Sequence, residues 1–381
     1  MFPFWIFAGP AVLLAWLSLL GEPRRARYAA RHLARQPRTL PPACVIVPVK
    51  GQDQGLRENL AALAALDYPD YDLIVVARTA LDIPPGVLPR RATIVLAHGE
   101  EAGTGEKAQN LAAAVRAAGM RPQVYAFADS DGRATPRWLR ALAEPLEETG
   151  VGASTGFRWF VPQPPAFWPM LRGVWDAAAM SRLSPDGARF AWGGAMAIRK
   201  EVFFEIGILG AWKHTVSDDY ALSAAVRRAG LRIAYAPGAL VPSHERLSAR
   251  EFLAWARRQL LLTRFYDRRL WWLALGAHVV YCGGMAAAIA ASILGNRLAV
   301  WALLAQLLPG MWKGRNRAAQ ARAALPEYEA WFKRHGWAHA VWTPLTTWTW
   351  LIVLATSAFG REVRWRGHRY ELGRAKRGAT A

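Results

Sequence analysis

The stretch Val124-Tyr-Ala-Phe-Ala-Asp-Ser-Asp-Gly132 combines five apolar residues with two acids and a glycine. Its apolar part predicts a buried strand that leaves Asp129 and Asp131 at the carboxyl edge of a sheet, where open α/β sheets bind ligands. Two carboxylates one residue apart on a turn can share one hard cation that also bridges a diphosphate. The same Asp-x-Asp is also explained by an Asx-type turn with two solvated acids.

Strand and helix patterns alternate on the N-terminal side of this stretch. Residues 43–51 predict a buried strand that leaves through a proline into a glycine turn, and residues 73–77 and 93–96 predict two more strands. Helices are expected around 59–66 and 107–118. Because strands that alternate with helices form parallel sheets, the predicted fold class is α/β with a mostly parallel, doubly wound sheet.

Composition and charge indicate a membrane component. The chain has 381 residues, of which 53% are hydrophobic, with 19 Trp and a net charge of +20. This length allows two domains, or one domain of roughly 200–250 residues with membrane elements. Because the basic residues flank apolar runs, the charge indicates an anionic membrane surface as partner and no nucleic acid. Cys44 and Cys282 form no metal or disulfide framework in this pattern, which fits a reducing, cytosolic face.

An uncharged run over residues 2–20 predicts a transmembrane helix, because it is just long enough to span hydrocarbon at about 1.5 Å per residue. No Lys or Arg precedes it, which argues against a cleaved signal peptide. Six arginines follow within residues 24–38, so the positive-inside rule places the chain after residue 21 in the cytoplasm. We expect a multi-pass protein of the bacterial inner membrane with a cytoplasmic catalytic domain.

Five motifs follow one another in the order Val47-Pro-Val-Lys-Gly51, Gly105-Glu-Lys-Ala-Gln-Asn110, Phe127-Ala-Asp-Ser-Asp131, Trp192-Gly-Gly-Ala-Met-Ala-Ile-Arg199 and Ser217-Asp-Asp-Tyr220. The ordered set resembles family 2 glycosyltransferases of the GT-A fold, and most of all their membrane-bound, ceramide-glucosyltransferase-like branch. The resemblance covers residues 43–270, with a weaker echo in Trp365-Arg-Gly-His-Arg-Tyr370. It implies a Rossmann-like GT-A catalytic domain with N-terminal and C-terminal transmembrane helices.

The resemblance implies roles for the two acidic motifs. Asp129 would face the nucleotide and, with Asp131, hold a Mg²⁺ or Mn²⁺ ion that neutralises the diphosphate leaving group. Asp219 would be the base that takes the proton of the acceptor hydroxyl, and Asp218 would orient it. One base and one displacement imply inversion at the anomeric carbon. Without the resemblance, a structural role explains the second motif: Ser217 would be a helix N-cap, and the helix dipole would favour the two acids that follow it.

Further contacts to the nucleotide sugar are implied for Pro48, Lys50, Asp82, Lys107, Asn110, Gln259 and Arg264. Asp82 would substitute, from a shifted turn, for an acid that many members carry at the end of the second strand, and an ordinary turn residue explains it equally. His244 stands where many GT-A enzymes place a third metal ligand. A structural, hydrogen-bonded histidine is the alternative there.

Residues 247–270 mix arginines with aromatic residues, which predicts amphipathic helices in the membrane interface. Processive members carry Gln-x-x-Arg-Trp here, whereas this chain has Gln259-Leu-Leu-Leu-Thr-Arg264-Phe-Tyr, a spacing that disfavours polymer synthesis. Proline-broken aromatic residues over 157–175 predict an apolar acceptor path and make a simple buried helix unexpected. Trp192, Gly193 and Gly194 would form an acceptor-binding floor, because glycine lets backbone approach closely.

Three apolar segments remain near the C-terminus: 271–294 is long enough to span, 298–312 is short, and 338–359 is interrupted by Pro344. Three full spans would put the basic tail outside, so one of the last two segments is expected to be re-entrant or interfacial. The predicted organisation is an anchor at 1–21, a basic juxtamembrane segment at 22–42, a GT-A domain at 43–246, interface helices at 247–270, a transmembrane and re-entrant region at 271–360 and a basic tail at 361–381.

The predicted function is that of a membrane-bound, metal-assisted, inverting glycosyltransferase of glycolipid or sphingolipid metabolism. It would move a hexose, glucose first, from a UDP-sugar to a hydroxyl of a ceramide-like or other hydroxylated lipid. A processive polysaccharide synthase of the same superfamily is one alternative. A non-catalytic, basic, lipid-binding membrane protein is another, but it gives no reason for Asp129, Asp131 and Asp219 to occur in catalytic order.

Overall fold

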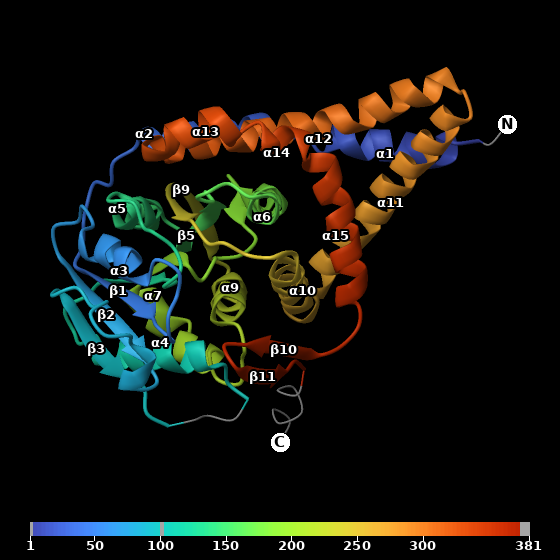
Figure 1. Ribbon diagram of the computed structural model, residues 1–381. Helices are drawn as coiled ribbons and strands as arrows, with labels where there is room; N and C mark the ends of the chain where they lie inside the picture. The colour runs from blue at the N-terminus through green and yellow to red at the C-terminus, as the bar shows by residue number, and fades with distance from the viewer. Residues whose placement is uncertain (1–2, 100–102, 374–381) are drawn as a thin grey trace.

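A seven-stranded sheet forms the centre of the computed structural model, which describes residues 3–99 and 103–373 (Figure 1). The strand order is β3-β2-β1-β4-β8-β5-β9. The strands are β1 (Ala43–Pro48), β2 (Tyr71–Ala77), β3 (Ala92–Leu96), β4 (Val124–Ala128), β5 (Val151–Phe160), β8 (Ala195–Arg199) and β9 (Arg232–Ser243). Neighbours run parallel except at β8, which is antiparallel to both β4 and β5. The predicted α/β class with a mostly parallel sheet is confirmed.

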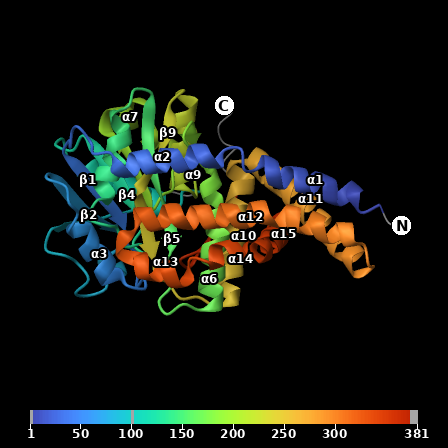
Figure 2. The same cartoon turned by 90° about the horizontal axis from the view of Figure 1, so that it is seen from above.

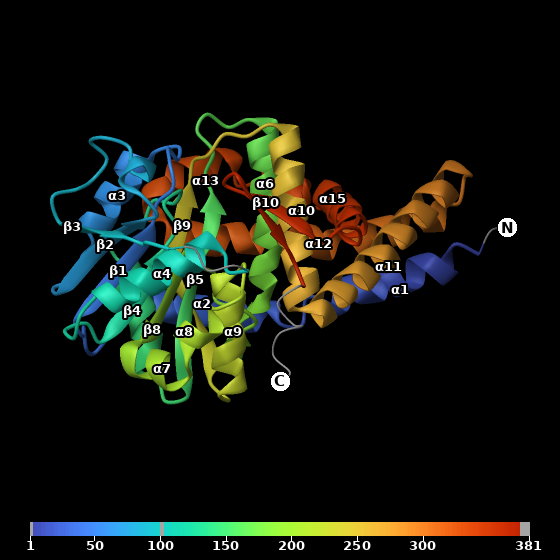
Figure 3. The ribbon, with the colours of Figure 1, turned by 90° about the horizontal axis from the view of Figure 1, so that it is seen from below.

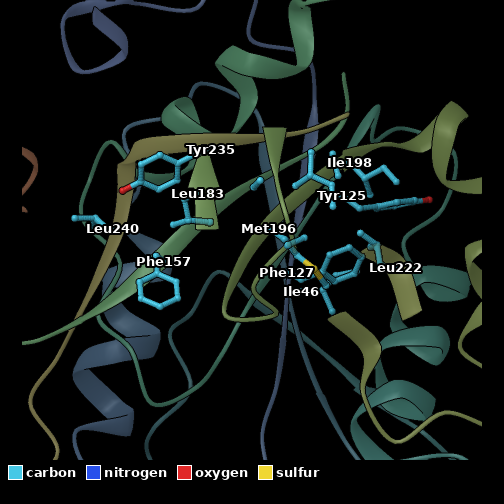
Figure 4. Packing of buried hydrophobic residues seen from close by; sticks show 14 of the residues in the cluster. Ile46, Tyr125, Phe127, Phe157, Leu183, Met196, Ile198, Leu222, Tyr235 and Leu240 are labelled. Carbon is cyan, nitrogen blue, oxygen red and sulfur yellow. The ribbon is translucent and has the colours of Figure 1, made fainter. Parts of the chain in front are cut away.

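Both faces of the sheet are buried, as the continuous apolar runs of its strands require. Successive side chains point to opposite faces, so Ile46 and Phe127 join one core while Val45 and Val47 join the other. Figure 4 shows Ile46, Phe127 and Met196 close together within the first core.

Helices cover the two faces. On α3 (Leu56–Ala64), Leu56, Leu60 and Leu63 recur at helical spacing and pack into the second core, with α5 (Trp138–Ala143). The first core receives side chains from α4 (Glu106–Ala117), α6 (Phe167–Ala177), α7 (Lys200–Glu205), α8 (Ile208–Ala211) and α9 (Asp218–Arg228). Short elements complete this part: the 3-10 helices η1 (Ala80–Asp82), η2 (Glu144–Glu147) and η3 (Ala178–Arg182), and the ribbon of β6 (Leu183–Ser184) with β7 (Gly187–Ala188).

The remaining helices pack against one another beside the sheet. They are α1 (Trp5–Leu17), α2 (Glu22–Ala34), α10 (Ala249–Tyr266), α11 (Arg268–Ile293), α12 (Arg297–Ala324), η4 (Pro326–Tyr328), α13 (Glu329–His335), α14 (Ala338–Val341) and α15 (Thr343–Ser357). Helix α1 packs on α11 and α12, and α15 packs on α10 and α11. Figures 1 and 2 show α1, α11 and the first half of α12 extending away from the sheet as an arm.

Two stretches of the described chain, Trp5–Ala34 and Arg268–Ile293, are long and apolar enough to cross a membrane. Only 22% of the apolar window of each is buried, so most of these side chains face outward instead of filling a core. Large apolar side chains are exposed on the arm at Trp5, Ile6, Leu13, Trp16, Trp272, Leu273, Ile289, Leu298, Trp301 and Leu308. Such a large exposed apolar surface is typical of a membrane contact.

One expectation about the helices is wrong, and two other predicted segments have different bounds in the structure. The proline-broken aromatic segment does form a largely buried helix, α6, because Pro169 lies in its first turn, where a missing N–H costs nothing. The interface segment 247–270 is divided by Asp267, whose carboxylate caps α11 through the Leu270 amide. The short segment 298–312 is the first part of the 28-residue α12 and continues straight into a charged half.

The chain ends, within the described residues, in a hairpin of β10 (Glu362–Trp365) and β11 (His368–Glu371). Val363 and Leu372 are buried against Leu261 of α10, which fixes the hairpin to the helix. Figure 3 shows β10 crossing in front of α10. The predicted tail at 361–381 is described only to residue 373, and the first two residues of the predicted anchor also lie outside the described residues.

Candidate active site

The acid pair follows β4, as its apolar pattern predicts. The strand ends at Ala128, and Asp129 and Asp131 lie beyond its carboxyl edge, next to the parallel strand β1. Their carboxylates meet one guanidinium: Arg158 of β5 donates to Asp131 Oδ2 at 2.9 Å and to Asp131 Oδ1 at 2.5 Å, and its Nη2 lies 3.2 Å from Asp129 Oδ2. The two acids therefore converge on the same point.

The second acidic pair opens α9 and lies against the first. Lys107 Nζ of α4 is 2.8 Å from Asp129 Oδ1 and 3.4 Å from Asp218 Oδ2, so one ammonium joins the two motifs. Gly105 makes this approach possible, because a Cβ there would lie 2.7 Å from the Val216 carbonyl oxygen. The glycine before α4 thus lets the start of α4 pack on the segment that leads into α9.

Within the described residues, the Asp219 carboxylate accepts hydrogen bonds through one oxygen only. Its Oδ1 accepts hydrogen bonds from the Ser217 hydroxyl and, at 2.7 Å, from the Tyr220 amide. Ser217 occupies the N-cap position of α9, but its side chain makes no capping bond to the helix. The serine orients the acid rather than capping the helix, which leaves Asp219 Oδ2 for other partners.

Burial and neighbouring cations set the charges of these groups. Burial acts to raise the pKa of Asp129, but Lys107 and Arg158 outweigh it and hold that pKa below its ordinary value. Burial raises the pKa of Asp218 to about 7, against the pull of Lys107 and with the help of the negative Asp219. For Lys107, the acids Asp129 and Asp218 overcome burial and raise its pKa. The site therefore keeps Asp129 ionised, whereas Asp218 titrates near neutrality.

A third acid, Glu245, completes the cluster from the end of β9. Its Oε2 is 2.9 Å from Arg172 Nη1 and 3.7 Å from Arg158 Nη1. Burial and the nearby Asp131 raise the pKa of Glu245. Each of the three cations of this cluster, Lys107, Arg158 and Arg172, therefore has carboxylate partners.

The glycines before β8 bring backbone against the acids. A Cβ on Gly193 would lie 2.9 Å from Lys107 Nζ and 3.0 Å from Asp218 Oδ2, and one on Gly194 would lie 2.6 Å from Asp129 Oδ2. A side chain at either position would displace the acid cluster. Trp192 faces the guanidinium of Arg158, with the Arg158 Cζ 5.1 Å from the ring centroid.

The acids and cations of this cluster, together with Trp192, border one cavity of about 1000 Å³. The predicted site residues that line it are Pro48, Lys50, Lys107, Asn110, Asp129, Asp131, Trp192, Asp218, Asp219 and Gln259. The cavity continues to apolar and aromatic side chains of the arm, among them Leu14, Trp271 and Ala274, and to Trp350 of α15. One cavity thus borders both the residues of the separate sequence motifs and the helices whose apolar side chains face away from the protein.

Three predicted residues lie elsewhere and make local contacts. Asp82 forms a capping box with Thr79, in which its Oδ2 accepts from the Thr79 amide at 2.9 Å. Arg264 donates to the last carbonyl groups of α15, including that of Ser357 at 2.8 Å. His244 has one ring nitrogen 2.9 Å from the Val161 carbonyl oxygen and the other 3.0 Å from the Tyr328 hydroxyl. Their predicted roles in the site stay predictions.

Sequence reasoning missed several residues of the cavity. Arg158 lies in the aromatic run that was interpreted only as an acceptor path, and Glu245 is the neighbour of the histidine that drew attention instead. Arg258 also lines the cavity, one position before Gln259, with its Cζ 6.0 Å from the centroid of the Trp365 ring. Burial lowers the pKa of Arg258.

The C-terminal hairpin closes one end of the cavity. Arg366 donates to the Lys50 carbonyl oxygen at 2.8 Å and to Asp53 Oδ1 at 2.6 Å. His368 Nε2 lies 2.8 Å from Glu106 Oε2, and the Glu106 amide donates to the Tyr370 hydroxyl at 3.3 Å. The weak motif Trp365 to Tyr370 therefore belongs to the same site as Lys50, although more than 300 residues of sequence separate Arg366 from Lys50.

The acid pair fits a divalent cation in its donor chemistry. Two carboxylates that meet at one nitrogen of Arg158 present hard oxygen ligands from one side. In residues 3–99 and 103–373, no group of three His, Cys, Asp or Glu side chains is arranged to hold a metal ion. A metal at Asp129 and Asp131 would therefore take further ligands from the diphosphate of a donor or from water.

This chain is similar to two solved structures of sugar-transferring enzymes, and the first of them shares its architecture. The mannosyltransferase PcManGT from Pyrobaculum calidifontis, in complex with GDP-Man and Mn²⁺, matches with a TM-score of 0.51 and 20% identity, over 92% of this chain and 98% of its own. Glucosyl-3-phosphoglycerate synthase from Mycobacterium tuberculosis, in complex with Mn²⁺, UDP-Glc and phosphoglyceric acid, covers 62% of this chain and 82% of its own, with a TM-score of 0.39 and 16% identity. The fold is that of the GT-A glycosyltransferases.

The sequence narrows this class to one family. The family model of glycosyl transferase family 21 matches residues 5–378, so the chain belongs to that family and is a glycosyltransferase. The predicted resemblance to the ceramide-glucosyltransferase-like branch is confirmed at this level, and family 21 takes the place of the broader family 2. The match includes the arm and the hairpin as well as the sheet.

Proposed function

We propose that this protein is a membrane-bound, inverting glycosyltransferase that moves a hexose, glucose first, from a UDP-sugar to a hydroxyl group of a membrane lipid. One observation carries the proposal. A single cavity of about 1000 Å³ borders both the acid cluster and the outward-facing apolar helices of the arm. In such a cavity, a polar donor that enters from water can meet an apolar acceptor whose tails stay in the membrane.

The donor would bind between β1, the start of α4 and the hairpin. Pro48, Lys50, Lys107 and Asn110 line this part of the cavity, and the hairpin covers it through Arg366. Arg258 and Gln259 of α10 also reach the cavity. Arg258 forms no ion pair within the part of the chain that the structure describes, so its forked donors are available to a diphosphate.

Asp129 and Asp131 would hold a Mg²⁺ or Mn²⁺ ion together with the donor diphosphate. The bound ion acts as a Lewis acid that stabilises charge developing on the leaving group. Arg158 already neutralises both acids, so it would share them with the ion or withdraw toward Glu245. His244 remains a proposed further ligand only if its ring leaves the Val161 and Tyr328 contacts.

Asp219 would act as the general base. Its Oδ1 is fixed by Ser217 and the Tyr220 amide, so Oδ2 is the oxygen that would take the proton of the acceptor hydroxyl. The acceptor oxygen forms a bond to the anomeric carbon as the bond from that carbon to the diphosphate oxygen breaks, and UDP leaves. Asp218 would position this region through Lys107. One displacement inverts the anomeric configuration.

The acceptor would enter from the arm. Trp192 lies at the cavity wall above the closely packed backbone of Gly193 and Gly194, and α1, α11 and α15 supply the apolar side. Lipid tails would stay along these helices, in the bilayer, while the headgroup reaches the acids. The basic residues after the first helix favour a cytoplasmic position of the sheet domain, with domain limits near residues 43 and 246.

The test is UDP release by the full-length protein purified in detergent. UDP-glucose, UDP-galactose and UDP-N-acetylglucosamine are supplied with Mn²⁺ or with chelator, each with and without a total bacterial lipid extract. Release that requires both lipid and metal, with a glycolipid detected by mass spectrometry, supports the proposal. Turnover of no donor under any condition would favour a non-catalytic lipid-binding protein.

A further inference from the structure

The part of the cavity bordered by the arm contains a second charged group, which we call the basic end. It consists of Arg25 of α2 with Lys313 and Arg317 of α12, and Arg182 of η3 lies beside it. All four cations line the same cavity, and the positive Arg25 and the negative Glu22 both act electrostatically on Lys313 and Arg317. Apolar lining follows directly, from Leu14, Ala15, Ala274, Ala277 and Trp350.

The basic end lacks the compensation that the acid cluster has. Glu22 is its carboxylate, and both of its oxygens are engaged, by Arg25 and at 3.0 Å by Asn316 Nδ2. Lys313 Nζ donates to the Ser18 hydroxyl at 2.6 Å. Within the described part of the chain, Lys313 and Arg317 form no ion pair, and the buried Arg317 Nε has no hydrogen-bond partner.

Unpaired cations next to apolar surface carry an energetic cost. Burial lowers the pKa of Lys313 to about 8, and the neighbouring Arg317 contributes to the same shift. A buried charge is retained at such a position when a partner of opposite charge completes it. Nothing in the proposed base or donor chemistry uses Lys313 or Arg317, so their partner is expected from the acceptor.

We propose that the acceptor lipid carries an anionic group, a phosphate or a carboxylate, next to the hydroxyl that receives the sugar. Lys313 and Arg317 would bind this group, and the lipid tails would lie along α1 and α11. The inference rests on the proposed function, since it specifies the acceptor of the same cavity. A neutral, ceramide-like headgroup would leave both cations without a counter-charge, so it is the less suitable acceptor.

Retention of lipid by the full-length protein tests this without requiring turnover. The protein is equilibrated in neutral detergent micelles with equimolar dioleoyl-phosphatidylglycerol and dioleoylglycerol, which share their acyl chains and have free hydroxyls, and bound lipid is read by native mass spectrometry. We expect about tenfold preference for phosphatidylglycerol, which corresponds to about 1.4 kcal/mol. Equal retention of the two lipids would overturn the inference.

Matched variants separate the basic end from general surface charge. Lys313→Gln with Arg317→Gln should abolish the preference, whereas Lys313→Arg with Arg317→Lys should keep it. Arg315→Gln, an exposed position on the same helix outside the cavity, should have no effect. Equal loss in the Arg315 variant would show attraction by the whole basic surface and would refute a specific site. If the variant with two glutamines does not fold, the variant with Lys313→Arg and Arg317→Lys still tests the inference, because it should keep the preference for phosphatidylglycerol.

UDP release with the same two lipids distinguishes failure of this inference from failure of the proposed function. Preferential turnover with the anionic lipid, lost in the glutamine pair, supports both. Equal turnover with dioleoylglycerol keeps the function and rejects the anionic acceptor. If neither lipid nor the total extract supports release, the proposed function fails, and the retention measurement still decides whether the basic end binds anionic lipid.

Discussion

The two ends of the cavity balance their charges in opposite ways. In the acid cluster, Lys107, Arg158 and Arg172 each have carboxylate partners within 3.4 Å, so the site is assembled from the protein's own charges. At the basic end, Lys313 and Arg317 have none in the described chain. The difference indicates that the acid cluster is organised before substrate arrives, whereas the basic end depends on a ligand to complete it.

We expect the largest effect on the transfer rate from substitution of Asp219, the proposed base, rather than of a residue that balances charge in the acid cluster. Asp219→Asn keeps the shape and the hydrogen bonds to Oδ1 but removes the base. Transfer should fall by about 10³-fold, within the range for a general base, while donor binding changes little. Steady-state transfer rates and donor affinity by calorimetry check this. Asp131→Asn, by contrast, should weaken donor binding in Mn²⁺.

If Asp219→Asn lost donor affinity as strongly as rate, the residue would belong to donor binding. Ser217→Ala is the matched control, because it removes one of the two hydrogen bonds to Asp219 Oδ1 without removing the carboxylate. We expect it to lower the rate by about tenfold, since the base remains but is less well oriented. A rate equal to that of Asp219→Asn would mean that the hydroxyl itself takes part.

Removing the central cation should break the balance of the acid cluster. Arg158→Gln leaves the half-buried Asp129 and Asp131 beside one another without their shared partner, which should cost roughly 3 kcal/mol of folding stability. A divalent ion can replace the lost charge, so Mn²⁺ should raise the melting temperature of the variant more than that of the wild type. Thermal unfolding with Mn²⁺ and with chelator measures both effects.

An Arg158→Gln protein that melts like the wild type would show that the acids are solvated rather than dependent on the guanidinium. Arg140→Gln is a suitable comparison, because Arg140 pairs with Asp67 at 3.1 Å on the surface and should change stability by less than about 1 kcal/mol. Equal responses of the two variants to Mn²⁺ would argue against metal binding at the acid pair.

The parts of the fold and the site that depend on residues close together in the sequence could be predicted from it. The apolar run before Asp129 and the alternation of strands and helices are local, and they predicted the sheet and the position of the first acid pair correctly. The motif order placed Lys107, Asp129 and Asp219 in one site, and the structure brings them together in one cavity.

What escaped prediction depends on three-dimensional packing. Arg158 and Glu245 face the acids only because β5 and β9 lie side by side, which no single motif encodes. The hairpin reaches Lys50 across almost the whole chain. Helix α6 forms despite its prolines because Pro169 falls in the first turn, and a shift of one turn would have broken it. Arg264, whose spacing from Gln259 departs from the Gln-x-x-Arg-Trp motif, donates to carbonyl groups at the end of α15.

A smaller, pH-dependent effect is expected at Asp176, an acid of the cavity whose carboxylate forms no ion pair or hydrogen bond within residues 3–99 and 103–373. Burial raises its pKa to about 7, against the pull of Arg158 and Arg172. Because the folded-state pKa exceeds the ordinary value of 3.8, the stability contributed by its neutral form is complete below about pH 4 and is lost as the pH rises to 7.

Asp176→Asn should therefore be no more stable than the wild type at pH 4 and should become more stable toward pH 8. The gain is bounded by about 1.4 kcal/mol per pH unit in the titrating range, and a few degrees in melting temperature is a realistic size. Melting curves of both proteins at pH 4 to 8 provide the comparison. Parallel curves across this range would place the carboxylate in contact with solvent or with an unrecognised cation.

The smallest effect is expected at the hairpin that covers the donor end. Arg366→Ala removes the bonds to the Lys50 carbonyl and to Asp53, so the hairpin should open more readily and the donor KM should rise three- to tenfold, or about 1 kcal/mol. The acceptor KM should not change, since the basic end is bordered by helices and not by the hairpin. Arg369→Ala is the control, because within the described residues Arg369 forms its ion pair with Glu362 alone, on the exposed side, at 2.8 Å. A rise in both KM values, or the same rise in the Arg369 variant, would mean that the hairpin supports the whole cavity and that its two ends are not independent.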